Sequence, residues 1–130
     1  MSDWYAPLMN LDVAGFLRSV KAQSTDDLSA HTMPYSSANI REQSSLYTAA
    51  VQHFSPDEVA SWDVLHWVVF RLMLLKSNLT KMGGLEAAKL AKQRDVFKNT
   101  VITWFRENGF PTHNVVMSLK DKWFGMPSFY

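Results

Sequence analysis

The stretch DVLHWVVFRLMLLK, residues 63–76, is the most apolar part of the chain and decides its fold class. Its densest run, Val64 to Leu75, is about 12 residues long, whereas a helix that spans a membrane needs about 20. His66 and Arg71 also interrupt the run. A membrane span is therefore excluded, and the stretch is predicted to be a helix buried within protein.

Placed on a helical wheel at 100° per residue, this segment is apolar over more than half of its circumference. Leaving those side chains in water would forfeit roughly 1.5–3 kcal/mol each, so the helix must be surrounded. It is predicted to be the central helix of a bundle, and the alternative is that it lies against a second chain.

The remaining polar stripe of this helix carries Asp63, Trp67 and Arg71 at positions i, i+4 and i+8. One interpretation is an ion-paired solvent face on which neighbours half cover Trp67. The other is a contact surface, because Trp and Arg often dominate the binding energy of protein interfaces. Trp67 and Arg71 are therefore candidate partner-binding residues.

Helix start and stop signals flank the apolar segment. The sequence SPDE at residues 55–58 predicts a helix capped by Ser55, with a proline where a helix tolerates it best. This helix either breaks around residues 61–63, where capping residues recur, or continues to Met82 in an elongated molecule. The pair Gly83–Gly84 predicts a stop after the apolar helix.

Much of the rest of the chain is predicted to form further amphipathic helices. Three are expected after Asn10, Ile40 and Pro111, and a long one over residues 84–108. The fold class is therefore predicted to be all-α, a compact or slightly elongated bundle of about five or six helices with a central apolar helix. The chain is expected to form one domain over residues 1–130, with a polar loop at 24–39.

Composition excludes several classes of function. The chain has 130 residues, 47% of them hydrophobic, which suits a folded domain that needs no metal or disulfide. With 13 basic and 12 acidic side chains, its net charge of +1 does not by itself imply phosphate binding. The absence of cysteine excludes disulfides and thiolate chemistry. The opening residues lack the pattern of a signal peptide, so an intracellular, cytoplasmic location is expected.

The final residues DKWFGMPSFY, at 121–130, concentrate large apolar side chains at a chain end. An exposed aromatic tail invites aggregation, so the tail at 123–130 is expected to dock somewhere. It docks either on its own bundle or into a groove of a partner or a neighbouring copy. The tail contributes four further candidate partner-binding residues: Trp123, Phe124, Phe129 and Tyr130.

Signals for catalysis and metal binding are weak. Asp63 and His66 are three residues apart and can share a helix face, but a metal site normally needs three or four ligands. No serine lies in the strand–turn–helix elbow of a hydrolase. No catalytic residue, metal or cofactor is therefore predicted.

Nucleic-acid binding is an alternative, because the long helix carries a run of basic residues: Lys89, Lys92, Arg94 and Lys98. A helix that tracks phosphates concentrates its cations on one side, whereas Arg94 falls inside the apolar arc of this helix. Arg94 is instead expected to snorkel from the core edge or to pair with a carboxylate.

These patterns favour a non-enzymatic protein–protein interaction protein: an adaptor, an assembly component or an inhibitor that acts by occupying a surface. Its partner is another protein or a second copy of itself. A small accessory protein of a phage or mobile element fits this profile. The second interpretation is a helical nucleic-acid-binding module. The third is an enzyme whose site is assembled from distant carboxylates and histidines.

Overall fold

Helix α7 (Val64–Lys81) is the central element of the computed structural model, which describes residues 4–22, 45–123 and 129. Asp63 caps the helix, because its carboxylate accepts a hydrogen bond from the backbone N–H of His66 at 3.0 Å. The prediction of a central apolar helix is confirmed. Its buried side chains are Val64, Leu65, Trp67, Val68, Val69, Phe70, Leu72, Met73 and Leu75.

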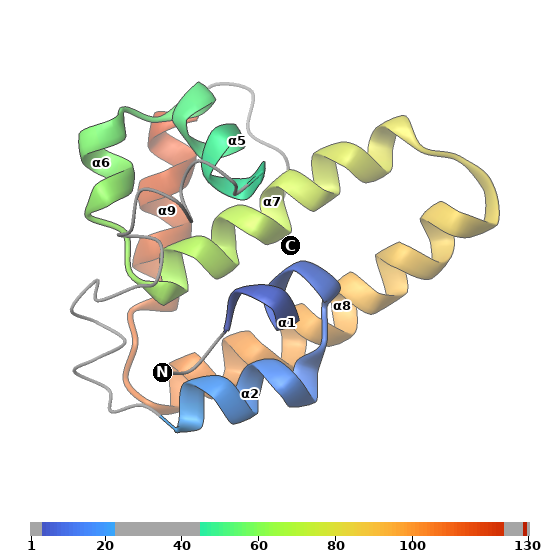
Figure 1. Cartoon of the computed structure of the whole chain (residues 1–130), viewed down its shortest axis with the longest axis horizontal. Helices are drawn as coiled ribbons and strands as arrows, with labels where there is room; N and C mark the ends of the chain where they lie inside the picture. The colour runs from blue at the N-terminus through green and yellow to red at the C-terminus, as the bar shows by residue number, and fades with distance from the viewer. Residues whose placement is uncertain (1–3, 23–44, 124–128, 130) are drawn as a thin grey trace.

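Helix α8 (Gly84–Glu107) turns back after Met82 and Gly83, so that α7 and α8 form a hairpin. The two helices are joined at one end and diverge toward the other (Figure 1). Gly84 has a φ of 71°, a left-handed conformation that glycine adopts without steric penalty. The predicted stop at Gly83–Gly84 is confirmed.

Helix α1 (Tyr5–Asn10) lies between the diverging helices α7 and α8, and α2 (Val13–Lys21) runs along α8 (Figure 1). The ring of Phe16 on α2 meets two rings of α8, at centroid distances of 5.4 Å to Phe97 and 6.4 Å to Phe105. All three rings are fully buried. Aromatic packing therefore holds the N-terminal pair of helices against α8.

Helix α2, expected to begin after Asn10 with that residue as its cap, begins at Val13. Asp12, rather than Asn10, accepts a hydrogen bond from the backbone N–H of Gly15 at 3.0 Å. Asn10 is instead the last residue of α1, a short helix that the sequence did not predict. Leu11 joins the two helices with a φ of 54°, in the left-handed region that a bulky side chain rarely adopts.

Helices α5 (Ser45–His53), α6 (Pro56–Ala60) and α9 (Thr112–Lys122) lie together on the other side of α7 (Figure 1). The hydroxyl of Ser55 accepts from the backbone N–H of Glu58 at 3.2 Å, which confirms the predicted cap. The helix ends at Ala60, so the predicted break before α7 is confirmed too.

The part of the chain that the structure describes contains seven α-helices and no strand, which confirms the all-α fold class. The short helix α1 is one reason why the number exceeds the five or six predicted. The polar segment at 24–39 lies outside the described residues. No helix in the described ranges is long and apolar enough to cross a membrane.

Candidate functional site

The structure does not expose the predicted stripe of α7. Trp67 is only 2% exposed and packs edge-on against Trp62, with ring centroids 4.9 Å apart. Arg71 is half-buried, and its Nη2 donates to the backbone carbonyl of Met9 in α1 at 2.9 Å. Burial lowers the pKa of Arg71. The expectation that neighbours only half cover Trp67 is wrong, because Trp62 packs on its ring and α1 contacts α7 beside Arg71. Partner binding through Trp67 and Arg71 stays a prediction.

The described residues of the C-terminal tail dock on their own bundle. Trp123 is buried and stacks on the ring of His53, with centroids 4.2 Å apart. It also meets Phe70 of α7 at 5.4 Å. Phe129 is likewise buried, whereas Phe124 and Tyr130 lie outside the described residues. Partner binding through the tail stays a prediction, and one that the burial of Trp123 and Phe129 does not favour.

The side chain of Arg94 holds the backbone of Phe129 against the bundle. The side chain is 2% exposed and donates from Nε to the carbonyl of Leu72 at 2.9 Å, and from Nη2 to the carbonyl of Phe129 at 2.7 Å. The carboxylate of Asp95 lies 3.7 Å from Nη1. Burial lowers the pKa of Arg94, and Asp95 opposes that shift. Arg94 therefore bridges α7, α8 and the chain end rather than reaching out to solvent.

The side chains of Asp63 and His66 lie together at the start of α7. His66 Nδ1 lies 2.6 Å from the carboxylate of Asp63, so the two side chains do share a helix face. Within the described ranges no three histidine, cysteine, aspartate or glutamate side chains gather where they could hold a metal ion. His31 lies outside those ranges. The pair has a structural explanation already, because Asp63 also caps α7.

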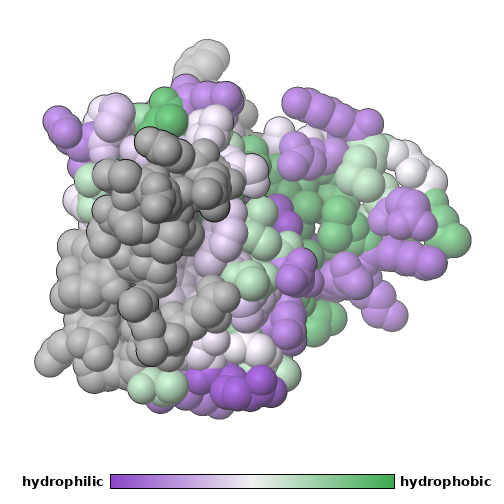
Figure 2. Space-filling model, viewed as in Figure 1, coloured by the Kyte–Doolittle hydropathy of each residue, from purple (hydrophilic) through white to green (hydrophobic). Residues whose placement is uncertain are grey.

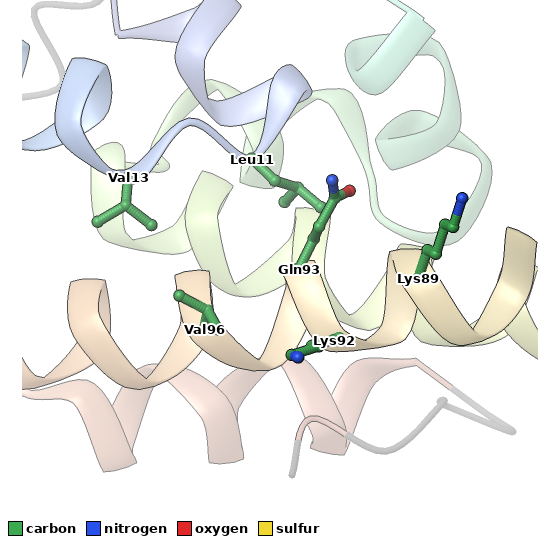
Figure 3. A pocket seen from close by; sticks show the side chains of 6 residues that line it. All are labelled: Leu11, Val13, Lys89, Lys92, Gln93 and Val96. Atoms are coloured by element: carbon green, nitrogen blue, oxygen red, sulfur yellow. The ribbon is translucent and has the colours of Figure 1, made fainter.

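A surface that was not among the predicted sites lies where α8 passes the turn between α1 and α2. Here an open groove of about 400 Å³ is lined by both segments. Leu11 and Val13 point from the turn toward α8, and Gln93 and Val96 point back from α8 (Figure 3). We call this hollow the α8 groove. Its lining residues are Leu11, Val13, Lys89, Lys92, Gln93 and Val96.

The groove continues along α8 as an exposed row that we call the α8 stripe: Leu85, Lys89, Lys92 and Val96. Their spacing of i, i+4, i+7 and i+11 places all four on one face of the helix. Leu85 is 69% exposed and Val96 is 52% exposed, more than the other large apolar side chains of the described chain. Figure 2 shows hydrophobic surface next to hydrophilic side chains on the projecting end of the hairpin.

Sequence patterns contained a signal for this stripe. Both apolar members fall among the charged residues of the solvent-facing side of α8, where a leucine and a valine have no core to fill. Two apolar side chains on the polar face of an amphipathic helix are therefore the sign to look for. The contributions of Leu11 and Val13 depend on tertiary packing and leave no such sign.

A second hollow of about 270 Å³ lies farther along α8, beside Phe129. Its lining includes the cations Lys98 and Arg106, next to the apolar side chain of Ile102. The hydroxyl of Thr103 turns inward to its own helix and donates to the carbonyl of Asn99 at 2.6 Å. Surface cations without converging donors do not define an anion site, so this hollow carries no assignment.

No family model matches the chain, and no curated protein or solved structure shows significant similarity to it.

Proposed function

We propose that this chain is a non-enzymatic interaction protein that docks another protein on the α8 stripe and the adjoining α8 groove. The observation that carries the proposal is the exposure of Leu85 and Val96 on one helix face, 69% and 52% respectively. Burying the exposed part of these two side chains would stabilise a complex by about 1–2 kcal/mol each. Exposed apolar groups with a polar rim are typical of protein interfaces.

The turn beside the groove supports the same surface. Leu11 keeps a φ of 54°, although a non-glycine residue in the left-handed region is disfavoured by roughly 1–2 kcal/mol. Its side chain lines the α8 groove. Strained residues of this kind occur often at binding sites, where the surrounding structure holds them in place.

An interaction role is also favoured because several charged side chains make hydrogen bonds that stabilise the fold. Asp63 and Arg71 serve the fold, the first as a helix cap and the second as a link to Met9. Arg94 is likewise committed to backbone carbonyls. An adaptor, an assembly component and an inhibitor all use a surface in this way, and the α8 stripe fits each of them.

Site-specific photocrosslinking tests the proposal in the cells that naturally produce the chain. A photoreactive amino acid at position 96 is expected to capture another protein, and adding Leu85→Asp should abolish the product. The matched control is the same group at Met117, an exposed apolar residue of α9. The proposal fails if position 96 gives no product, or if Met117 gives the same product in equal yield.

A further inference from the structure

The two lysines of the α8 stripe lie between its two apolar residues. Leu85 and Val96 are separated by about 16 Å along the helix, at 1.5 Å per residue. Lys89 and Lys92 are exposed, and among the described residues neither makes an ion pair. Their side chains lie on opposite edges of α8 when the groove is viewed face-on (Figure 3). The surface is therefore two apolar anchors with two lysines between them, neither of which makes an ion pair within the described ranges.

A second copy of the chain fits this surface poorly. In a twofold-symmetric contact between two α8 helices, Leu85 would meet Val96 of the other copy. The same symmetry would gather Lys89 and Lys92 of both copies near the twofold axis, because both pairs share one midpoint along the helix. Like charges placed opposite each other destabilise such a pairing. The apolar residues match in a self-contact, but the lysines do not.

We infer that the α8 stripe binds an acidic amphipathic helix of a different protein. Such a helix carries apolar residues at positions i and i+11 and carboxylates at i+4 and i+7. Leucine-like side chains then cover Leu85 and Val96 while the carboxylates pair with Lys89 and Lys92. The spacing i, i+4, i+7 and i+11 is unchanged when the helix direction is reversed, so the partner helix can run parallel or antiparallel to α8. This inference rests on the proposed docking at the stripe and names the class of partner.

Designed helical peptides test the partner's chemistry. One peptide has leucines at i and i+11 and glutamates at i+4 and i+7. A second has lysines in place of the glutamates, and a third has serines in place of the leucines. Titration into the isotope-labelled full chain, followed by amide chemical shifts, should give at least about tenfold tighter binding for the first peptide, an amount worth about 1.4 kcal/mol. The shifts should map to α8 and the turn at Leu11.

Charge reversal supplies the decisive comparison. A double variant, Lys89→Glu with Lys92→Glu, changes two exposed side chains and is expected to keep the fold, checked by circular dichroism. Its preference should switch from the acidic to the basic peptide. The inference is overturned if the wild-type chain does not prefer the acidic peptide, or if the preference survives the reversal. It is also overturned if a short DNA duplex binds these lysines more tightly than the acidic peptide does.

The two proposals fail in different ways. A crosslink at position 96 without any preference for the acidic peptide removes the acidic-helix inference and leaves the docking surface. Loss of the crosslink removes both.

Discussion

Replacing Arg94 by methionine is expected to lower the free energy of unfolding by about 1–3 kcal/mol, the cost of a buried polar group without its partner. Methionine fills much of the space of the arginine stem but donates no hydrogen bond. The carbonyl of Leu72 lies inside α7, where the helical ladder supplies another donor. The loss therefore falls on the carbonyl of Phe129, which Arg94 holds at 2.7 Å.

Replacing Arg94 by lysine is expected to cost more than replacing it by methionine. Nε and Nη2 of the arginine reach two carbonyls in different directions, and a single ammonium group cannot reproduce that fork. Lysine would also keep a charge in a site where the present side chain is 2% exposed. A buried charge without sufficient hydrogen bonds is more unfavourable than an apolar group of similar size.

Urea unfolding followed by far-ultraviolet circular dichroism measures all three proteins. The expected order of stability is wild type, then Arg94→Met, then Arg94→Lys, with similar slopes against urea concentration. A methionine variant as stable as the wild type would refute the role of Arg94 in holding the chain end. A lysine variant with full stability would show that the fork geometry is unimportant.

Three further predictions concern helix α7, the His53 ring and the α8 stripe. Asp63→Ala should destabilise the fold by about 1 kcal/mol in urea unfolding, while Asp63→Asn retains most of the cap. Burial lowers the pKa of His53 below its ordinary value of 6.5, so the unfolded chain takes up the proton first and stability falls as pH drops below that value. His53→Phe, which keeps a ring against Trp123, should reduce this loss when urea midpoints at about pH 8 and pH 5 are compared. Val96→Asp should leave the free energy of unfolding within about 0.5 kcal/mol of wild type, because the side chain is on the surface; a larger loss would place it in the core.

Local signals predicted the helix boundaries around α7. The cap at Ser55, the break before Asp63 and the stop at Gly83–Gly84 depend on residues within a few positions of one another, so sequence alone specifies them. Asn10 and Asp12 show the limit of such reasoning. Both are good capping residues, and the presence of the short helix α1 decides that Asp12 is the one used.

The burial of Trp67 could not be predicted from the sequence of α7 alone. A helical wheel describes one helix and does not say which other helices cover it, so the sparse polar stripe of α7 looked open to water. In the structure α1 lies on that side, and Arg71 satisfies the carbonyl of Met9 there. The α8 stripe is the converse case, because Leu85 and Val96 lie among charged residues of α8 and were not predicted as candidates, and the structure shows that both side chains are exposed.

We propose the α8 stripe as the contact surface in place of the C-terminal tail. This choice requires that the aromatic side chains of the tail belong to the core. The free energy of unfolding of Trp123→Ala tests this most directly, because the ring stacks on His53 and meets Phe54 and Phe70. We predict a loss of about 3–5 kcal/mol, as for other large aromatic side chains removed from a core. An unchanged free energy of unfolding would contradict this and return the tail to the candidate partner-binding surface.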